Sequence, residues 1–114
     1  MSNNQEKMTI QQLQNDVDEW IRTIGGRYFN ELTNLGILME EVGELSKILV
    51  RKYGEQSFKS GENDQNLADE MADVLWVLVC LANQTGIDLE AAIKANFNKK
   101  TNRDRLRHKN NPKL

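Results

Sequence analysis

The segment from Leu67 to Ala82 constrains the fold more than any other part of the chain. Its second half, Val74–Ala82, is an uninterrupted apolar run that could form a buried strand if it stood alone. The run follows directly on helix-favouring residues, so we predict one helix from a cap at Asn66 to a stop at Gly86. A helix that is apolar on every side must be covered on every side. A chain this short can hardly supply that cover, so we expect a homo-oligomer with this helix near the subunit interface.

Three further segments have the apolar spacing of amphipathic helices, bounded by capping residues. They run from Thr9 to Gly25–Gly26, from Asn30 to Tyr53, and from Asp88 to Asn98–Lys100. The predicted fold is therefore all-α, with a four-helix bundle-like subunit that oligomerises through its helices as a homodimer or homotetramer.

The composition suits one globular domain of 114 residues, with 39% hydrophobic and 28% charged residues. The polar start, Met1–Lys7, is followed by no apolar signal segment, and the longest apolar run is too short to span a bilayer. Cys80 is the single cysteine, so no internal disulfide can form. We therefore expect a cytoplasmic protein without a membrane partner, in which Cys80 is a core residue rather than a nucleophile.

Two pairs of acids lie inside helices that otherwise have core-like sequences. Glu41 and Glu44 are three residues apart, as are Glu70 and Asp73, so each pair occupies one helical face. If the two helices pack side by side, four carboxylates converge and repel one another unless a cation neutralises them or some take up protons. Oxygen ligands favour a hard ion, Mg²⁺ or alternatively Mn²⁺. Iron and zinc are disfavoured because the only histidine, His108, lies in the tail.

The stretch Glu40-Glu41-Val42-Gly43-Glu44, followed by Glu70-Met71-Ala72-Asp73, resembles the E-E-x-x-E and E-x-x-D signature of MazG-like nucleotide pyrophosphohydrolases, a branch of the all-α NTP pyrophosphatases. The likeness extends from roughly Trp20 to Asp104. It implies hydrolysis of a nucleoside triphosphate between the α and β phosphates, giving a monophosphate and pyrophosphate. The sequence leaves open the preferred base and sugar, and whether the role is house-cleaning of the nucleotide pool.

The resemblance also implies roles for individual residues. Mg²⁺ would be held by Glu41, Glu44, Glu70 and Asp73. Glu40 would orient or deprotonate water, so that Glu40 and Glu41 form the catalytic pair. Asn98, Lys99 and Arg103 match the region that contacts phosphate, although Lys100-Thr101-Asn102 departs from the commoner aromatic-containing form.

Three aromatic residues are candidates to stack on the base of the substrate. They are Trp20, Tyr28 and Phe29. Tyr28 and Phe29 stand together at a turn between two predicted helices, where they could equally form an apolar plug over the end of the bundle.

The end of the chain is strongly basic. From Lys99 onward there are seven Lys or Arg residues and one acid, Asp104. We assign residues 1–104 to the catalytic domain and expect 105–114 to be a disordered basic tail. The alternative is a non-catalytic helical module that binds nucleic acid through this tail, which would give steeply salt-dependent binding. A purely structural oligomer would leave the acidic pairs without a function.

Overall fold

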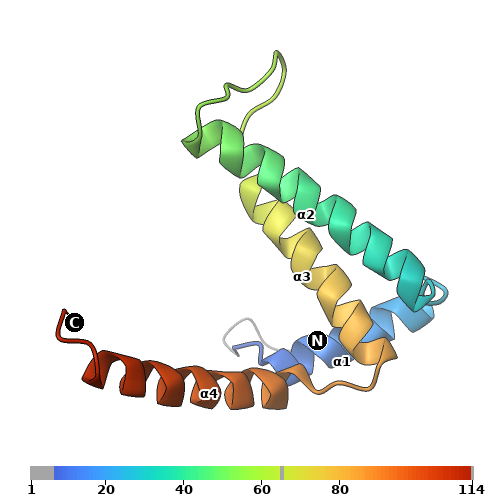
Figure 1. The fold of residues 1–114 in the computed structure, drawn as a ribbon. Coiled ribbons are helices and arrows are strands. Elements are labelled where there is room, and N and C mark those ends of the chain that lie inside the picture. The colour runs from blue at the N-terminus through green and yellow to red at the C-terminus, as the bar shows by residue number, and fades with distance from the viewer. Residues whose placement is uncertain (1–6, 65, 114) are drawn as a thin grey trace.

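The computed structural model describes residues 7–64 and 66–113 of the chain. This part of the chain forms four α-helices and no strand, which confirms the predicted all-α class. The helices are α1 (Ile10–Thr23), α2 (Glu31–Tyr53), α3 (Leu67–Gln84) and α4 (Leu89–Lys109), shown in Figure 1.

Most helix starts follow from local sequence. The side chains of Thr9, Asn30 and Asp88 each accept a hydrogen bond from the backbone N–H three residues further on, at 3.0, 2.8 and 3.1 Å. Each bond satisfies a donor that the first helical turn leaves without a partner. Asn66 occupies the predicted N-cap position of α3, but its side chain makes no capping hydrogen bond. The predicted capping contact at Asn66 is therefore wrong, although the helix begins where expected.

The end of α4 differs from the prediction. The expected end at Asn98–Lys100 is wrong, because the helix continues to Lys109 and includes the first part of the 105–114 tail that we expected to be disordered. No glycine or proline interrupts the sequence from Leu89 to Asn111. The last turn carries Arg107, His108 and Lys109, and positive charge there is favourable at the negative end of the helix dipole.

α3 lies at the centre of the packing. α2 runs along one side of it and α1 packs against it from another (Figure 1). The buried core joins Val17 and Ile21 of α1 to Val79 and Cys80 of α3, and Val79 has no exposed surface. Cys80 is only 4% exposed, which confirms that it is a core residue, and burial raises the pKa of its thiol.

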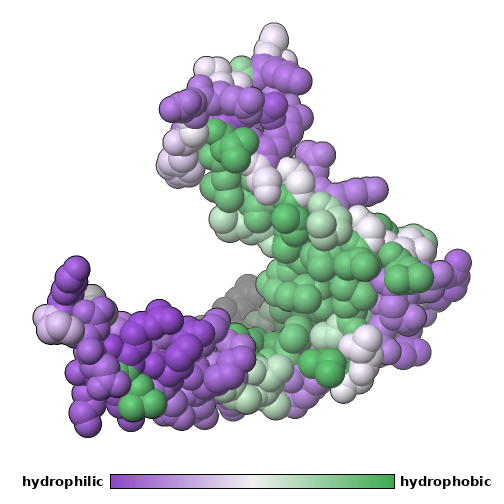
Figure 2. Space-filling view, in the orientation of Figure 1, coloured by the Kyte–Doolittle hydropathy of each residue, from purple (hydrophilic) through white to green (hydrophobic). Residues whose placement is uncertain are grey.

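α4 packs mainly against α1 and then extends away from α2 and α3 (Figure 1). It therefore does not close a bundle with the other helices inside one chain. A largely hydrophobic surface remains open over α2 and α3, whereas the surface of α4 is mostly hydrophilic (Figure 2). Large exposed apolar residues on α2 and α3 include Leu35, Met39, Val42, Met71, Leu75 and Leu78.

Among the described residues, no helix taken singly has both the length and the apolarity to cross a membrane. Only α3 and α4 counted together meet those criteria, and they are bent by 105° where they join. The predicted cytoplasmic location stays a prediction.

Asp18 anchors the connection between α1 and α2. The Tyr28 hydroxyl donates to Asp18 Oδ1 at 2.6 Å, and Arg22 Nε donates to Asp18 Oδ2 at 2.8 Å. These bonds, that from Arg22 first, lower the pKa of Asp18. Burial, followed by the hydrogen bond to Asp18, raises the pKa of Tyr28 to about 12. Tyr28 is thus held in place by its hydroxyl group.

We expect Asp18→Asn to lower the free energy of unfolding by about 1 kcal/mol at pH 7. Because the pKa of Asp18 is lower in the folded state than in the unfolded chain, its stabilisation is present above the unfolded pKa and is lost as the pH falls through the folded value. The difference between the variant and wild type should therefore be smaller at about pH 3 than at pH 7. Urea unfolding at both pH values measures this, with Asp16→Asn, an exposed change on α1, as control. An equal difference at both pH values would refute the role of the Asp18 charge.

Candidate active site

The contact between α2 and α3 brings acids from both helices together. Glu41 of α2 and Glu70 and Asp73 of α3 are half-buried, and one carboxylate oxygen from each lies within 4.8 Å of the others. The local cause is a stripe of residues along one face of α2, formed by Ile37, Glu41 and Ile48, of which Ile48 is buried. That stripe faces α3, so an acid within it also faces α3. Three of the four predicted ligands therefore surround one small volume.

Glu44 and Glu40, the remaining predicted acids, are more exposed. Burial raises the pKa of Glu41, with further increases from the charges of Asp73 and Glu70. Burial also raises the pKa of Glu70, followed by Asp73 and Glu44. Glu44 therefore acts electrostatically on the group of three although its own carboxylate lies outside it. We call Glu41, Glu44, Glu70 and Asp73 the acidic cluster.

The acidic cluster fits a hard divalent cation. Its donors are all carboxylate oxygens, which suit Mg²⁺ or Mn²⁺. Within the described residues, none of the ion pairs involves a member of the cluster. The basic residues further along α2, Lys47 and Arg51, pair with Glu62 of the following loop instead. The repulsion among these carboxylates is thus left for a bound cation or protons to relieve.

A cavity of about 310 Å³ lies one helical turn from the acidic cluster. Its lining includes Ile37 of α2, four residues before Glu41. It also includes Val77 of α3, four residues after Asp73. We call this cavity the aromatic pocket, because Trp20, Tyr28, Phe29 and Trp76 all line it. The three aromatic residues singled out in the sequence therefore lie together.

The aromatic pocket is built by α1, α2, α3 and the α1–α2 connection. Trp20 and Trp76 meet edge to face, with ring centroids 5.2 Å apart and an interplanar angle of 86°. Arg27 lies over the ring of Phe29, 6.0 Å from its centroid. Nucleobases stack on such aromatic surfaces with little dependence on their identity.

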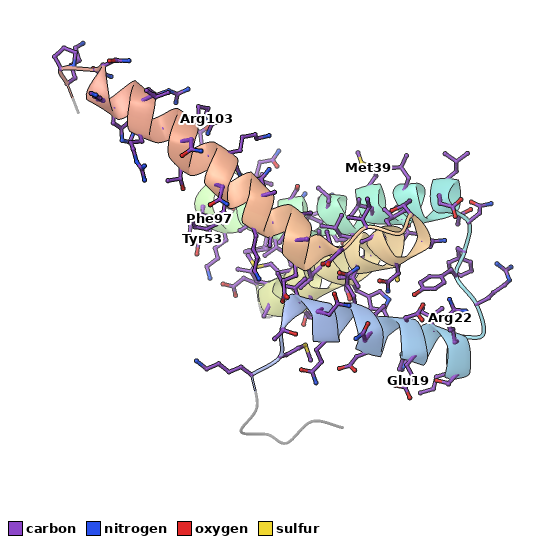
Figure 3. All side chains as sticks on the ribbon, turned by 90° about the horizontal axis from the view of Figure 1, so that it is seen from below. Glu19, Arg22, Met39, Tyr53, Phe97 and Arg103 are labelled. Carbon is purple, nitrogen blue, oxygen red and sulfur yellow. The ribbon has the colours of Figure 1, made fainter. Side chains whose placement is uncertain are left out.

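The predicted phosphate-contacting residues do not join the acidic cluster within one chain. Asn98, Lys99 and Arg103 are exposed on α4, and none of them lines the aromatic pocket. Arg103 lies on the part of α4 that extends beyond the other helices (Figure 3), where its Nε donates to Asp104 at 3.0 Å.

The residues of the aromatic pocket that were not predicted from the sequence include Arg27, Asn34 and Trp76. The available signal for Asn34 was its spacing, three residues before Ile37 and seven before Glu41, on the helical face that meets α3. Trp76 follows Asp73 by three residues and could have been found in the same way.

The fold and the site define a class of all-α proteins in which acids from two neighbouring helices lie beside an aromatic pocket. The family model for the MazG nucleotide pyrophosphohydrolase domain matches residues 29–108. The chain belongs to this family and is therefore a nucleotide pyrophosphohydrolase. The match favours the enzyme over the nucleic-acid-binding module.

Two curated proteins of Bacillus subtilis (strain 168) are similar in sequence. YpjD is 39% identical, over 87% of this chain and 89% of YpjD. YvdC is 32% identical, over 77% of this chain and 92% of YvdC.

Two crystal structures share the fold. That of YPJD from Bacillus subtilis, described as a proposed pyrophosphatase, has a TM-score of 0.67 and 35% identity, covering 96% of this chain and 99% of YPJD. That of a Bacillus-conserved MazG protein, described as a nucleotide pyrophosphohydrolase, has a TM-score of 0.70 and 35% identity, covering 82% of this chain and 90% of that protein.

Proposed function

We propose that this chain is a Mg²⁺-dependent nucleoside triphosphate pyrophosphohydrolase. It cleaves the bond between the α and β phosphates and releases a nucleoside monophosphate and pyrophosphate. The observation that carries this proposal is the meeting of Glu41, Glu70 and Asp73 beside the aromatic pocket, with carboxylate oxygens within 4.8 Å of one another. Mn²⁺ has the same preference for oxygen ligands and can replace Mg²⁺.

The acidic cluster holds the cation, with Glu44 as the fourth carboxylate. When bound, Mg²⁺ neutralises negative charge on the phosphate oxygens and favours attack by water. Glu40 stands next to Glu41 on α2 and is exposed, so water can reach it. Its side chain orients the attacking water or accepts its proton.

The aromatic pocket takes the nucleobase. Trp20 and Phe29 offer ring surfaces for stacking, while Tyr28 contributes its ring from a position fixed by Asp18. One helical turn, about 5.4 Å along the axis, separates this pocket from the acidic cluster. A nucleotide with its base in the pocket can therefore extend its phosphates towards the acids.

The functional form is a homodimer or homotetramer. The hydrophobic surface over α2 and α3 in Figure 2 is the surface that such an assembly would cover. In an oligomer, α4 of one copy can approach the acidic cluster of another. That arrangement would let Asn98, Lys99 and Arg103 contact the phosphates that they cannot reach within one chain.

A panel of common and modified nucleoside triphosphates, assayed with Mg²⁺ for pyrophosphate release, tests the proposed reaction. We expect monophosphate and pyrophosphate as the only products and no reaction in EDTA. The scissile bond is tested with two analogues: the β,γ-methylene triphosphate should be cleaved and the α,β-methylene triphosphate should not. Release of orthophosphate and a diphosphate would show that the assigned bond is wrong.

A further inference from the structure

Asn34 is the most deeply buried polar residue of the aromatic pocket. It lies on α2, is 5% exposed, and belongs to the pocket lining. Its Nδ2 donates to Gln84 Oε1 of α3 at 2.7 Å and to the backbone oxygen of Phe29 at 3.4 Å. Both donor positions of the amide are thus used inside the protein.

The orientation of the Asn34 amide follows from a chain of obligatory partners. The Phe29 carbonyl oxygen can only accept, so the Gln84 atom that contacts it must be the donor, Nε2. Gln84 Oε1 is then the acceptor that faces Asn34, and Asn34 must present Nδ2 to it. Oδ1 is consequently the atom that Asn34 directs elsewhere.

Asn34 Oδ1 is left as an acceptor without a donor among the described residues. Every fully enclosed side-chain nitrogen or oxygen in that part of the chain has a hydrogen-bond partner. Oδ1 therefore has some accessible surface, and Asn34, although only slightly exposed, is one of the residues that line the aromatic pocket. A ligand that donates a hydrogen bond to such a buried acceptor gains binding free energy.

We propose that Asn34 Oδ1 selects nucleotides whose base carries an amino group at pyrimidine C4 or purine C6, which are cytosine and adenine, by accepting a hydrogen bond from that group. This specificity rests on the proposed function, which places the base in the aromatic pocket. Cytosine N4 and adenine N6 are donors, whereas uracil, thymine and hypoxanthine carry a carbonyl oxygen at the equivalent position. A carbonyl oxygen there would set two acceptors against each other and leave Oδ1 unpaired. Arg27, in the same lining, offers donors to the acceptor atoms of the base.

Nucleotide binding can be measured without metal or hydrolysis. Trp20 and Trp76, the two tryptophans of the chain, both line the aromatic pocket, so their fluorescence reports on its occupation. Titration of the full-length protein in EDTA should give at least about tenfold tighter binding of dCMP than of dUMP. Equal affinities for the two monophosphates would overturn the proposal.

Hydrolysis gives the second readout. The kcat/KM of wild type should be at least about tenfold higher for dCTP than for dUTP, or for dATP than for dITP. Asn34→Leu should bring these ratios to within about twofold of one, whereas the control variant Gln11→Leu, an exposed change on α1, should preserve them. The wild-type ratios decide the question even if Asn34→Leu fails to fold.

The two proposals fail in different ways. If no triphosphate is hydrolysed but dCMP still binds more tightly than dUMP, the proposed reaction is wrong and the role of Asn34 is supported. If triphosphates are hydrolysed and wild type treats both members of each amino–carbonyl pair alike, the role of Asn34 is wrong and the reaction stands.

Discussion

Replacing Glu41 by Gln is expected to lower kcat for triphosphate hydrolysis by about a thousandfold while the helical fold persists. Glutamine keeps the size of the side chain but removes one anionic oxygen ligand from the centre of the acidic cluster. Burial raises the pKa of Glu41, and the charges of Asp73 and Glu70 across the α2–α3 contact raise it further. Glu41 therefore interacts with both acids of the neighbouring helix.

The same substitution should raise the thermal midpoint in EDTA. The raised pKa of Glu41 means that its ionised form is disfavoured in the folded protein, and a neutral amide removes that penalty. Circular dichroism melts and initial rates on the same preparations measure both effects. Glu19→Gln, an exposed change on α1 (Figure 3), should match wild type in rate. Wild-type turnover by Glu41→Gln would exclude the acidic cluster as the catalytic site.

Replacing Gln14 by Ala should lower the free energy of unfolding by about 3 kcal/mol. Gln14 is 5% exposed on α1. Its Nε2 donates to Asn83 Oδ1 at 3.1 Å and to the Ile87 carbonyl at 2.8 Å, while its Oε1 accepts from Leu89 N at 2.9 Å. Alanine leaves these partly buried groups without a partner, and such groups are expensive to leave unpaired.

Urea unfolding followed by tryptophan fluorescence measures this loss. Gln11→Ala is the matched control on the same helix, because Gln11 is exposed and bonds only to Asn15 within α1, at 3.2 Å. The control should fall within about 0.5 kcal/mol of wild type. If both variants unfold at the same urea concentration, the hydrogen bonds of Gln14 do not stabilise the contact between α1 and the α3–α4 connection.

The parts of the structure that depend on near neighbours could be predicted from the sequence. A cap such as Thr9 contacts an N–H three residues away, and the spacing of Glu41 to Glu44 fixes one helical face. The apolar surroundings of these acids indicated that they face another helix. The pairing of α2 with α3 was only a condition of the metal-site hypothesis, because apolar faces on both helices show a need for cover but not which partner supplies it.

The hydrogen bonds that could not be predicted from the sequence join distant parts of the chain. Gln14 and Asn83 are 69 positions apart, and Asn34 and Gln84 are 50 apart. A polar residue looks the same in sequence whether it is exposed or holds two helices together. The direction of α4 could not be predicted either, because it depends on contacts between α4 and other helices. Its end at Lys109 rather than near Lys100 reflects uninterrupted helix-compatible sequence, and the domain boundary after Asp104 stays a prediction.

Binding of Mn²⁺ to the wild-type protein, followed by the loss of the free-ion signal in electron paramagnetic resonance, asks whether the acids of α2 and α3 hold a divalent cation. We expect saturable binding to wild type, displacement by excess Mg²⁺, and loss of binding in Glu41→Gln/Asp73→Asn. Absence of binding to wild type, or equal binding to wild type and the double variant, would show that these carboxylates do not form the metal site.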